Sequence, residues 1–93
     1  LFSLHYSPGI PLRMNVKKPN EGEAFVLIKK RKINSKNYFF LSKNNNLIKA
    51  ARNLYPLIRK IKNKGYKKIA VEKIPNIGIG QTINDRLERA SKY

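Results

Sequence analysis

The sequence lacks cysteine and tryptophan, and its 93 residues include one histidine and five acidic residues. Without cysteine, neither a disulfide nor a cysteine-based metal site can form, and a cytoplasmic setting is expected. No Ser-His-Asp or Cys-His catalytic set can be assembled around the single imidazole, that of His5. No apolar run reaches the roughly 18 residues that a membrane span needs, so we expect no membrane partner, and nothing resembles a signal peptide.

The few carboxylates are scattered along the chain rather than paired. They are Glu21, Glu23, Glu72, Asp85 and Glu88. General acid–base chemistry needs a second carboxylate or an imidazole at a defined spacing, and none of the five has one. Glu72 follows an apolar strand, at the end where open α/β sheets place their sites, but a salt bridge to a neighbouring lysine is the preferred interpretation. The residues by themselves therefore predict no self-sufficient enzyme and no metal site.

The charge balance is strongly basic, with 21 Lys and Arg residues and a formal net charge of +16. A basic surface attracts polyanions, so a small basic module that binds RNA or tRNA is one hypothesis. The rival explanation is codon bias, because Lys, Asn and Ile fill about two fifths of the chain and all three have A/T-rich codons. Arginine, the better reader of phosphates and bases, is scarce, and net charge alone leaves both explanations open.

The most informative stretch, Ile69–Ala90, predicts a short buried strand, a turn rich in Pro and Gly, and a helix. The apolar, β-branched run Ile69–Val71 predicts the strand, which Pro75 and Asn76 close. The helix is predicted by apolar residues that recur at three- and four-residue steps and so share one face. These residues are Ile79, Ile83, Leu87 and Ala90. A strand, a glycine turn and a helix make half of a βαβ unit, so the rest of the chain should supply a sheet.

Three more strands are predicted before this unit, over Leu12–Val16, Glu23–Ile28 and Asn37–Ser42. The basic segment 29–36 between the second and third of them predicts an exposed loop or a hairpin tip. A helix should follow, capped by one of Asn44–Asn46 and closed by a left-handed Gly65. Its apolar stripe runs from Leu47 to Ile61.

Pro56 lies inside that helix, where proline removes a hydrogen bond. We therefore expect a kink near Arg52, in preference to two shorter helices. The helix crosses over from Asn37–Ser42 to a fourth strand, Tyr66–Val71, which makes those two strands parallel. The predicted fold class is α/β, a small Rossmann-like layer in the order β-β-β-α-β-α. Its sheet is predicted to be mixed, with at least one parallel pair.

The chain begins with Leu1 rather than Met, and residues 1–11 hold two prolines and a glycine among aromatic residues. We expect the chain to begin inside a longer reading frame, or to have been trimmed or truncated. Residues 1–11 are predicted to link two domains, and residues 12–93 to form the α/β domain. Whether the protein is free-standing or a fragment stays open.

Gly78-Ile79-Gly80 lies between a predicted strand and a helix, where backbone N–H groups can hold a phosphate. The dinucleotide fingerprint needs a third glycine where this chain has Ile83, and the Lys-Ser/Thr pair of a P-loop is missing. The preferred interpretation is that the glycines permit a tight turn and a close helix–sheet contact. A nucleotide or phosphate site at Gly78 and Gly80, in a regulatory domain, is the alternative.

Two blocks of the chain carry a family resemblance. The first block comprises NLYPLIRKI, KKIAVEKIP and GIGQTINDRLERAS. It is similar to the C-terminal domain of the two-domain threonylcarbamoyl-AMP synthases, the tRNA-modification enzymes of the YrdC type. Its matching residues are Leu54, Tyr55, Ile58, Arg59, Val71, Glu72, Gly78, Gly80, Asn84, Asp85, Arg86, Leu87 and Ala90. The second block, HYSPGIPLRMNV with GEAFVLI, resembles the linker into that domain and its first strands, and its linker matches are His5, Tyr6 and Pro8. The departures are Ser7 and Pro56, where alanine is usual, and Lys62, where an aspartate is frequent.

The resemblance implies an accessory domain of an enzyme that condenses L-threonine, bicarbonate and ATP into threonylcarbamoyl-adenylate. The catalytic pocket, with its ATP and Mg²⁺, would belong to an N-terminal YrdC-type domain, the implied partner. This chain alone is therefore expected to be inactive and to hold no cofactor. The resemblance implies a role for His5, Tyr6 and Pro8 as lid residues that close over that pocket and exclude water. Because the product serves tRNA modification in translation, tRNA is a further candidate partner.

Overall fold

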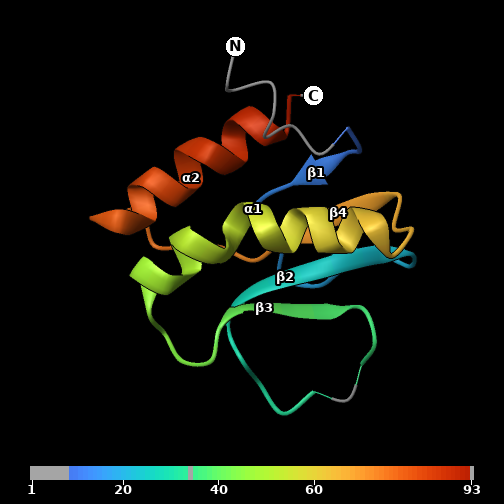
Figure 1. The fold of residues 1–93 in the computed structure, drawn as a ribbon, viewed down its shortest axis with the longest axis horizontal. Helices are drawn as coiled ribbons and strands as arrows, with labels where there is room; N and C mark the ends of the chain where they lie inside the picture. The colour runs from blue at the N-terminus through green and yellow to red at the C-terminus, as the bar shows by residue number, and fades with distance from the viewer. Residues whose placement is uncertain (1–8, 34, 93) are drawn as a thin grey trace.

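Strands and helices follow one another in the predicted order in a computed structural model, which describes residues 9–33 and 35–92. The elements are β1 (Leu12–Arg13), β2 (Glu23–Lys29), β3 (Tyr38–Ser42), α1 (Leu47–Asn63), β4 (Lys68–Val71) and α2 (Ile79–Ala90). Figure 1 shows α1 lying across the sheet and α2 lying beside α1, and residues of both helices share one hydrophobic cluster with the strands. The predicted α/β class is confirmed.

The sheet has the strand order β1-β4-β2-β3, and all three pairings are parallel. The prediction of at least one parallel pair is therefore confirmed, whereas the prediction of a mixed sheet is wrong. The reason lies in the basic segment after β2. On either side of residue 34, its described residues lead from the end of β2 back to the start of β3 (Figure 1), whereas a hairpin tip would have made the two strands antiparallel. The crossover through α1 also joins parallel strands as predicted, but β2 lies between β3 and β4.

One face of the sheet carries the main core. Side chains alternate between the two faces along a strand, and on this face they pack against α1 and α2. The buried residues of α1 follow the predicted stripe and are Ala50, Leu54, Ile58 and Ile61. The strands contribute Leu12, Ala24, Val26, Ile28, Phe39, Leu41, Ile69 and Val71 to the same cluster. We call this the helix-covered face.

The stripe of α2 differs from the prediction at its first residue. Ile83, Leu87 and Ala90 are buried as expected, but Ile79 is 43% exposed and Gly80 takes the buried place. A Cβ atom at Gly80 would stand 1.9 Å from the carbonyl oxygen of Pro75, so only glycine fits there. This close contact fixes the face that α2 presents to the core, and it turns Ile79 outward.

The opposite face, here called the helix-free face, has a smaller cluster. Its buried residues are Val16, Phe25, Leu27 and Ala70, with Tyr38 and Phe40 half-buried beside them. The rings of Phe25 and Tyr38 meet edge to face, with centroids 5.3 Å apart. Strand β2 is thus buried on both faces, which explains its continuous apolar sequence.

The ends of α1 are built as the sequence predicts. The side chain of Asn46 accepts a hydrogen bond of 3.0 Å from the N–H of Lys49, and Gly65 has a φ of 96° after the last turn. The helix continues without a break through Pro56, so the alternative of two shorter helices is wrong. The kink near Arg52 stays a prediction. Pro56 is exposed, so its missing N–H is on the side that faces water.

The Cα radius of gyration of 12.1 Å equals the value of about 12 Å expected for a compact domain of this length. Among the described residues, no helix is long and apolar enough to cross a membrane.

Candidate functional site

The candidate lid residues His5, Tyr6 and Pro8 lie outside the described residues, so their role stays a prediction. The described chain starts at Gly9, and the carbonyl of Pro11 accepts a hydrogen bond of 2.9 Å from the N–H of Ile69 in β4. Residues 9–11 thus reach the sheet at the amino end of the two neighbouring strands β1 and β4.

The glycine turn before α2 is explained by backbone geometry. Gly78 caps the helix with φ 55° and ψ −130°, a conformation that residues with a Cβ avoid, and Gly80 makes the close contact with Pro75. The N–H groups of Gly80 and Gln81 already donate to the carbonyls of Ile77 and Gly78, at 2.9 and 3.1 Å. Turn and contact therefore account for both glycines, as the preferred interpretation predicted, although the contact is with the turn rather than the sheet.

Asn84 fastens α2 to this turn. Its side-chain amide donates to the carbonyl of Ile74 at 3.0 Å and to the side-chain oxygen of Asn76 at 3.3 Å. Between the helices, the guanidinium of Arg86 lies 5.7 Å from the ring centroid of Tyr55, a cation–π contact. Three residues that carry the family resemblance are thus structural, because they hold α2 against the turn and against α1.

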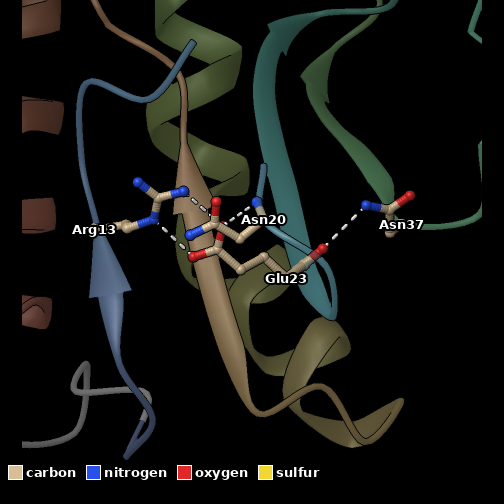
Figure 2. A network of polar contacts seen from close by, with 4 residues as sticks. All are labelled: Arg13, Asn20, Glu23 and Asn37. Carbon is tan, nitrogen blue, oxygen red and sulfur yellow. Dashed lines mark hydrogen bonds and ion pairs between the residues drawn. The ribbon is translucent and has the colours of Figure 1, made fainter. Parts of the chain in front are cut away.

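The first charged centre joins β1 to β2 at the amino end of the sheet. Arg13 donates two hydrogen bonds to the carboxylate of Glu23, Nε to Oε2 at 2.7 Å and Nη2 to Oε1 at 2.8 Å. Figure 2 shows the two side chains meeting across the strand between them, which is β4. The N–H of Asn20 donates to Oε1 at 2.6 Å, and Asn37 donates to the carbonyl of Glu23 at 3.0 Å.

The side chain of Glu23 is only 4% exposed, so its charge depends on these donors. The hydrogen bonds from Arg13 hold the pKa of Glu23 below its ordinary value of 4.5, against the desolvation that raises it, and the N–H of Asn20 adds to the lowering. No role for Glu23 was predicted from the sequence. The signal that could have found it is an acidic residue at the start of a continuous apolar strand, where a buried charge needs a partner.

The second charged centre lies at the opposite end of the sheet. Glu72 accepts from the N–H of Ile28 at 2.7 Å and from Nη2 of Arg31 at 2.6 Å, and its side chain is 15% exposed. The predicted salt bridge is present, but its partner is an arginine of the β2–β3 loop rather than a lysine. Glu72 therefore ties the carboxyl end of β4 to β2 and to that loop.

The two best-placed carboxylates thus hold strands together. Each uses both oxygens in hydrogen bonds to backbone N–H groups and arginine. In residues 9–33 and 35–92, no three His, Cys, Asp or Glu side chains gather into a group that could hold a metal ion. Because both oxygens of Glu23 and of Glu72 already accept hydrogen bonds, these two carboxylates do not suit Mg²⁺, and we assign them no metal-dependent step.

Comparison with known proteins gives two matches. Residues 2–92 match a family model described as threonylcarbamoyl-AMP synthase, C-terminal domain. Among solved structures, the crystal structure of P. abyssi Sua5 complexed with L-threonine is similar, with a TM-score of 0.70 over 95% of this chain and 23% sequence identity. At this identity the likeness shows the fold, and the chain spans 30% of the length of that protein. No curated protein matches the chain.

Proposed function

The chain belongs to the family of threonylcarbamoyl-AMP synthase C-terminal domains, and we propose that it is the accessory domain of an L-threonylcarbamoyladenylate synthase. The observation that carries the proposal is the family match over residues 2–92. The reaction proposed for the whole enzyme joins L-threonine, bicarbonate and ATP and releases pyrophosphate. Its product would serve tRNA modification in the cytoplasm.

The catalytic pocket, with ATP and Mg²⁺, is proposed to belong to an N-terminal YrdC-type domain outside this chain. The 30% share of the P. abyssi protein that this chain spans supports this division of labour. So does the use of Glu23 and Glu72 in ion pairs, because neither carboxylate has a free oxygen for general acid–base chemistry.

His5, Tyr6 and Pro8 are proposed to form a cover over that pocket. A closed cover excludes water and so protects a reactive acyl-adenylate from hydrolysis. Because Pro11 is hydrogen-bonded to β4, the folded domain gives this linker a fixed attachment only a few residues away. In this proposal the domain anchors one end of the cover.

The test compares the full-length enzyme with a version that ends before this domain. Pyrophosphate release and threonylcarbamoyl-adenylate formation are measured together with threonine, bicarbonate and ATP. We expect the truncated enzyme to form less product per pyrophosphate released, because water enters an uncovered pocket. Equal product yield and rate in the two proteins would overturn the accessory role.

A finer test separates the cover from the rest of the domain. His5→Ala and Tyr6→Ala in the full-length enzyme are expected to lower the product yield, whereas the control Lys17→Ala, at an exposed residue of the turn after β1, is expected to keep it. The phosphate role of Gly78 and Gly80 is a separate hypothesis. Unchanged amide NMR shifts at both glycines under millimolar ATP or AMP would remove it.

A further inference from the structure

Acidic residues are absent from the middle of the chain. No Asp or Glu occurs from Ala24 to Val71, a stretch that carries 14 of the 21 Lys and Arg residues. This stretch forms the rest of β2 after Glu23, then β3, α1 and β4. A codon bias raises the lysine content along the whole chain, but it does not explain why one half of the chain has no acidic residue. The segregation of charge is therefore a property of this domain that codon bias leaves unexplained.

A hollow of about 390 Å³ lies within this acid-free part, where the edge strand β3 leads into α1. Lys30, Lys43 and Lys49 line it, together with Asn44 and the half-buried ring of Phe40. We call it the lysine hollow. Its three ammonium groups come from the end of β2, the end of β3 and the first turn of α1.

None of these three lysines forms an ion pair in the described structure. The ion pairs of residues 9–33 and 35–92 join Arg13 to Glu23, Arg31 to Glu72 and Lys92 to Glu88. All five acidic residues of the chain lie outside the lining of the hollow. The lysines therefore repel one another across a concave surface, and a bound anion would relieve that repulsion.

The place of Lys49 strengthens this argument. It is the third residue of α1, where a capping box places Glu or Gln, and the first turn holds no acidic residue. A cation there opposes the positive end of the helix dipole and weakens the isolated fold. The arrangement costs stability unless a negative group occupies the hollow.

A second hollow of about 530 Å³ lies at the other end of β3. Lys36, Lys64 and Tyr66 line it, so it is also basic and free of carboxylates. The five residues of β3 span about 16 Å, so the two hollows lie along one edge of the molecule. A single phosphate fits one hollow, whereas an extended polyanion contacts both. Two basic hollows along one edge therefore favour an extended polyanion over a free nucleotide.

We propose that the β3–α1 side of the domain, centred on the lysine hollow, binds the phosphate backbone of RNA. Lysine ammonium groups contact phosphate oxygens as point charges, and such contacts give affinity without reading sequence. The choice of RNA over DNA rests on the proposed function, which places the domain in an enzyme that serves tRNA. The place of the site rests on charge and shape alone.

The test measures binding of a fluorescein-labelled tRNA transcript to the full-length protein by anisotropy, from about 50 to about 300 mM KCl. The site variant combines Lys30→Gln, Lys43→Gln and Lys49→Gln. The control variant combines Lys17→Gln, Lys18→Gln and Lys73→Gln, three exposed lysines outside both hollows, and it loses the same net charge. Thermal denaturation of both variants checks that they fold.

We expect the site variant to bind at least about tenfold more weakly near 100 mM salt. The slope of its log affinity against log salt concentration should fall by between about 2 and about 3, because each of the three lost phosphate contacts removes just under one unit. The control variant should keep its slope within about one unit and its affinity within about threefold. Equal losses in both variants would show that net charge alone binds RNA, and no measurable binding by the unaltered protein would also overturn the site. Failure of the proposed function would appear elsewhere, as unchanged synthesis after removal of the domain in an assay without RNA.

Discussion

The two faces of the sheet are held by different interactions. On the helix-covered face, sixteen buried apolar residues form one cluster with α1 and α2. On the helix-free face the buried cluster has four residues, and an Arg–Glu pair lies at each end of the sheet, Arg13–Glu23 at one end and Arg31–Glu72 at the other. The first face therefore depends on hydrophobic burial, and the second depends also on ionised carboxylates.

The largest effect is expected on the helix-covered face. Leu54 of α1 is 1% exposed in the centre of the main cluster, and Leu54→Ala should lower the free energy of unfolding by about 3 kcal/mol, since it removes buried methyl groups and leaves a cavity. Urea denaturation measures the loss. The matched control is Ile48→Ala in the same helix, where the side chain is 61% exposed and a change within about 0.5 kcal/mol is expected. Similar losses at both positions would contradict the packing described here.

The next effect tests the charged pair at the amino end. Glu23→Gln keeps the shape of the side chain but removes the charge that Arg13 and Asn20 contact, and it should cost about 2 kcal/mol near pH 7. Because the folded protein holds the pKa of Glu23 below its ordinary value, the charge stabilises the fold above about pH 4.5, and this contribution is lost as the pH falls through the lowered pKa. The difference between the two proteins should therefore shrink between pH 5 and the onset of acid unfolding. A difference that stays constant over this range would contradict the assignment.

A smaller loss is expected at the carboxyl end. Glu72→Gln should cost about 1 kcal/mol, because Arg31 is half exposed and water replaces part of its contact, although the N–H of Ile28 loses a charged acceptor. A double-mutant cycle with Arg31→Gln isolates the pair from the contact with Ile28. Its coupling energy should be smaller than that of the cycle between Arg13 and Glu23. The reverse order would refute the ranking of the two pairs.

The smallest effect has the opposite sign. Lys49→Glu should raise the free energy of unfolding by about 0.5 kcal/mol, because it places a negative charge at the start of α1 and completes a capping box with Asn46. Thermal denaturation at low salt measures the gain, and added salt should reduce it. A loss of stability would mean that Lys49 already has a stabilising partner, which would also weaken the case for the lysine hollow.

The sequence predicted the elements better than their arrangement. Helix limits followed from local signals, such as the Asn46 cap, Gly65 and the spacing of apolar residues in α1. The all-parallel sheet was not predicted, because β3 is parallel to β2 only if the loop between them returns to the amino end of the sheet. The composition of segment 29–36 does not show whether it does. The exposure of Ile79 was missed because Ile79 and Gly80 both fit the helical spacing with Ile83, and the choice depends on the contact of Gly80 with Pro75.

The candidate site was less predictable for a related reason. Arg13 and Glu23 are ten residues apart, and they meet only because both strands lie beside β4. The lysine hollow likewise gathers residues from β2, β3 and α1. Such groupings depend on the strand order, which local periodicity does not contain. The glycine turn was predictable, because the roles of Gly78 and Gly80 depend on backbone geometry within a few residues.

We propose that the domain supports a catalytic pocket outside this chain, while Glu23 and Glu72 stabilise its own fold. The most direct measurement is pyrophosphate release by the purified 93-residue chain with ATP, L-threonine and bicarbonate. We expect a rate equal to that of the buffer alone. Pyrophosphate release that requires both threonine and bicarbonate would contradict it, and would mean that this chain holds an active site of its own.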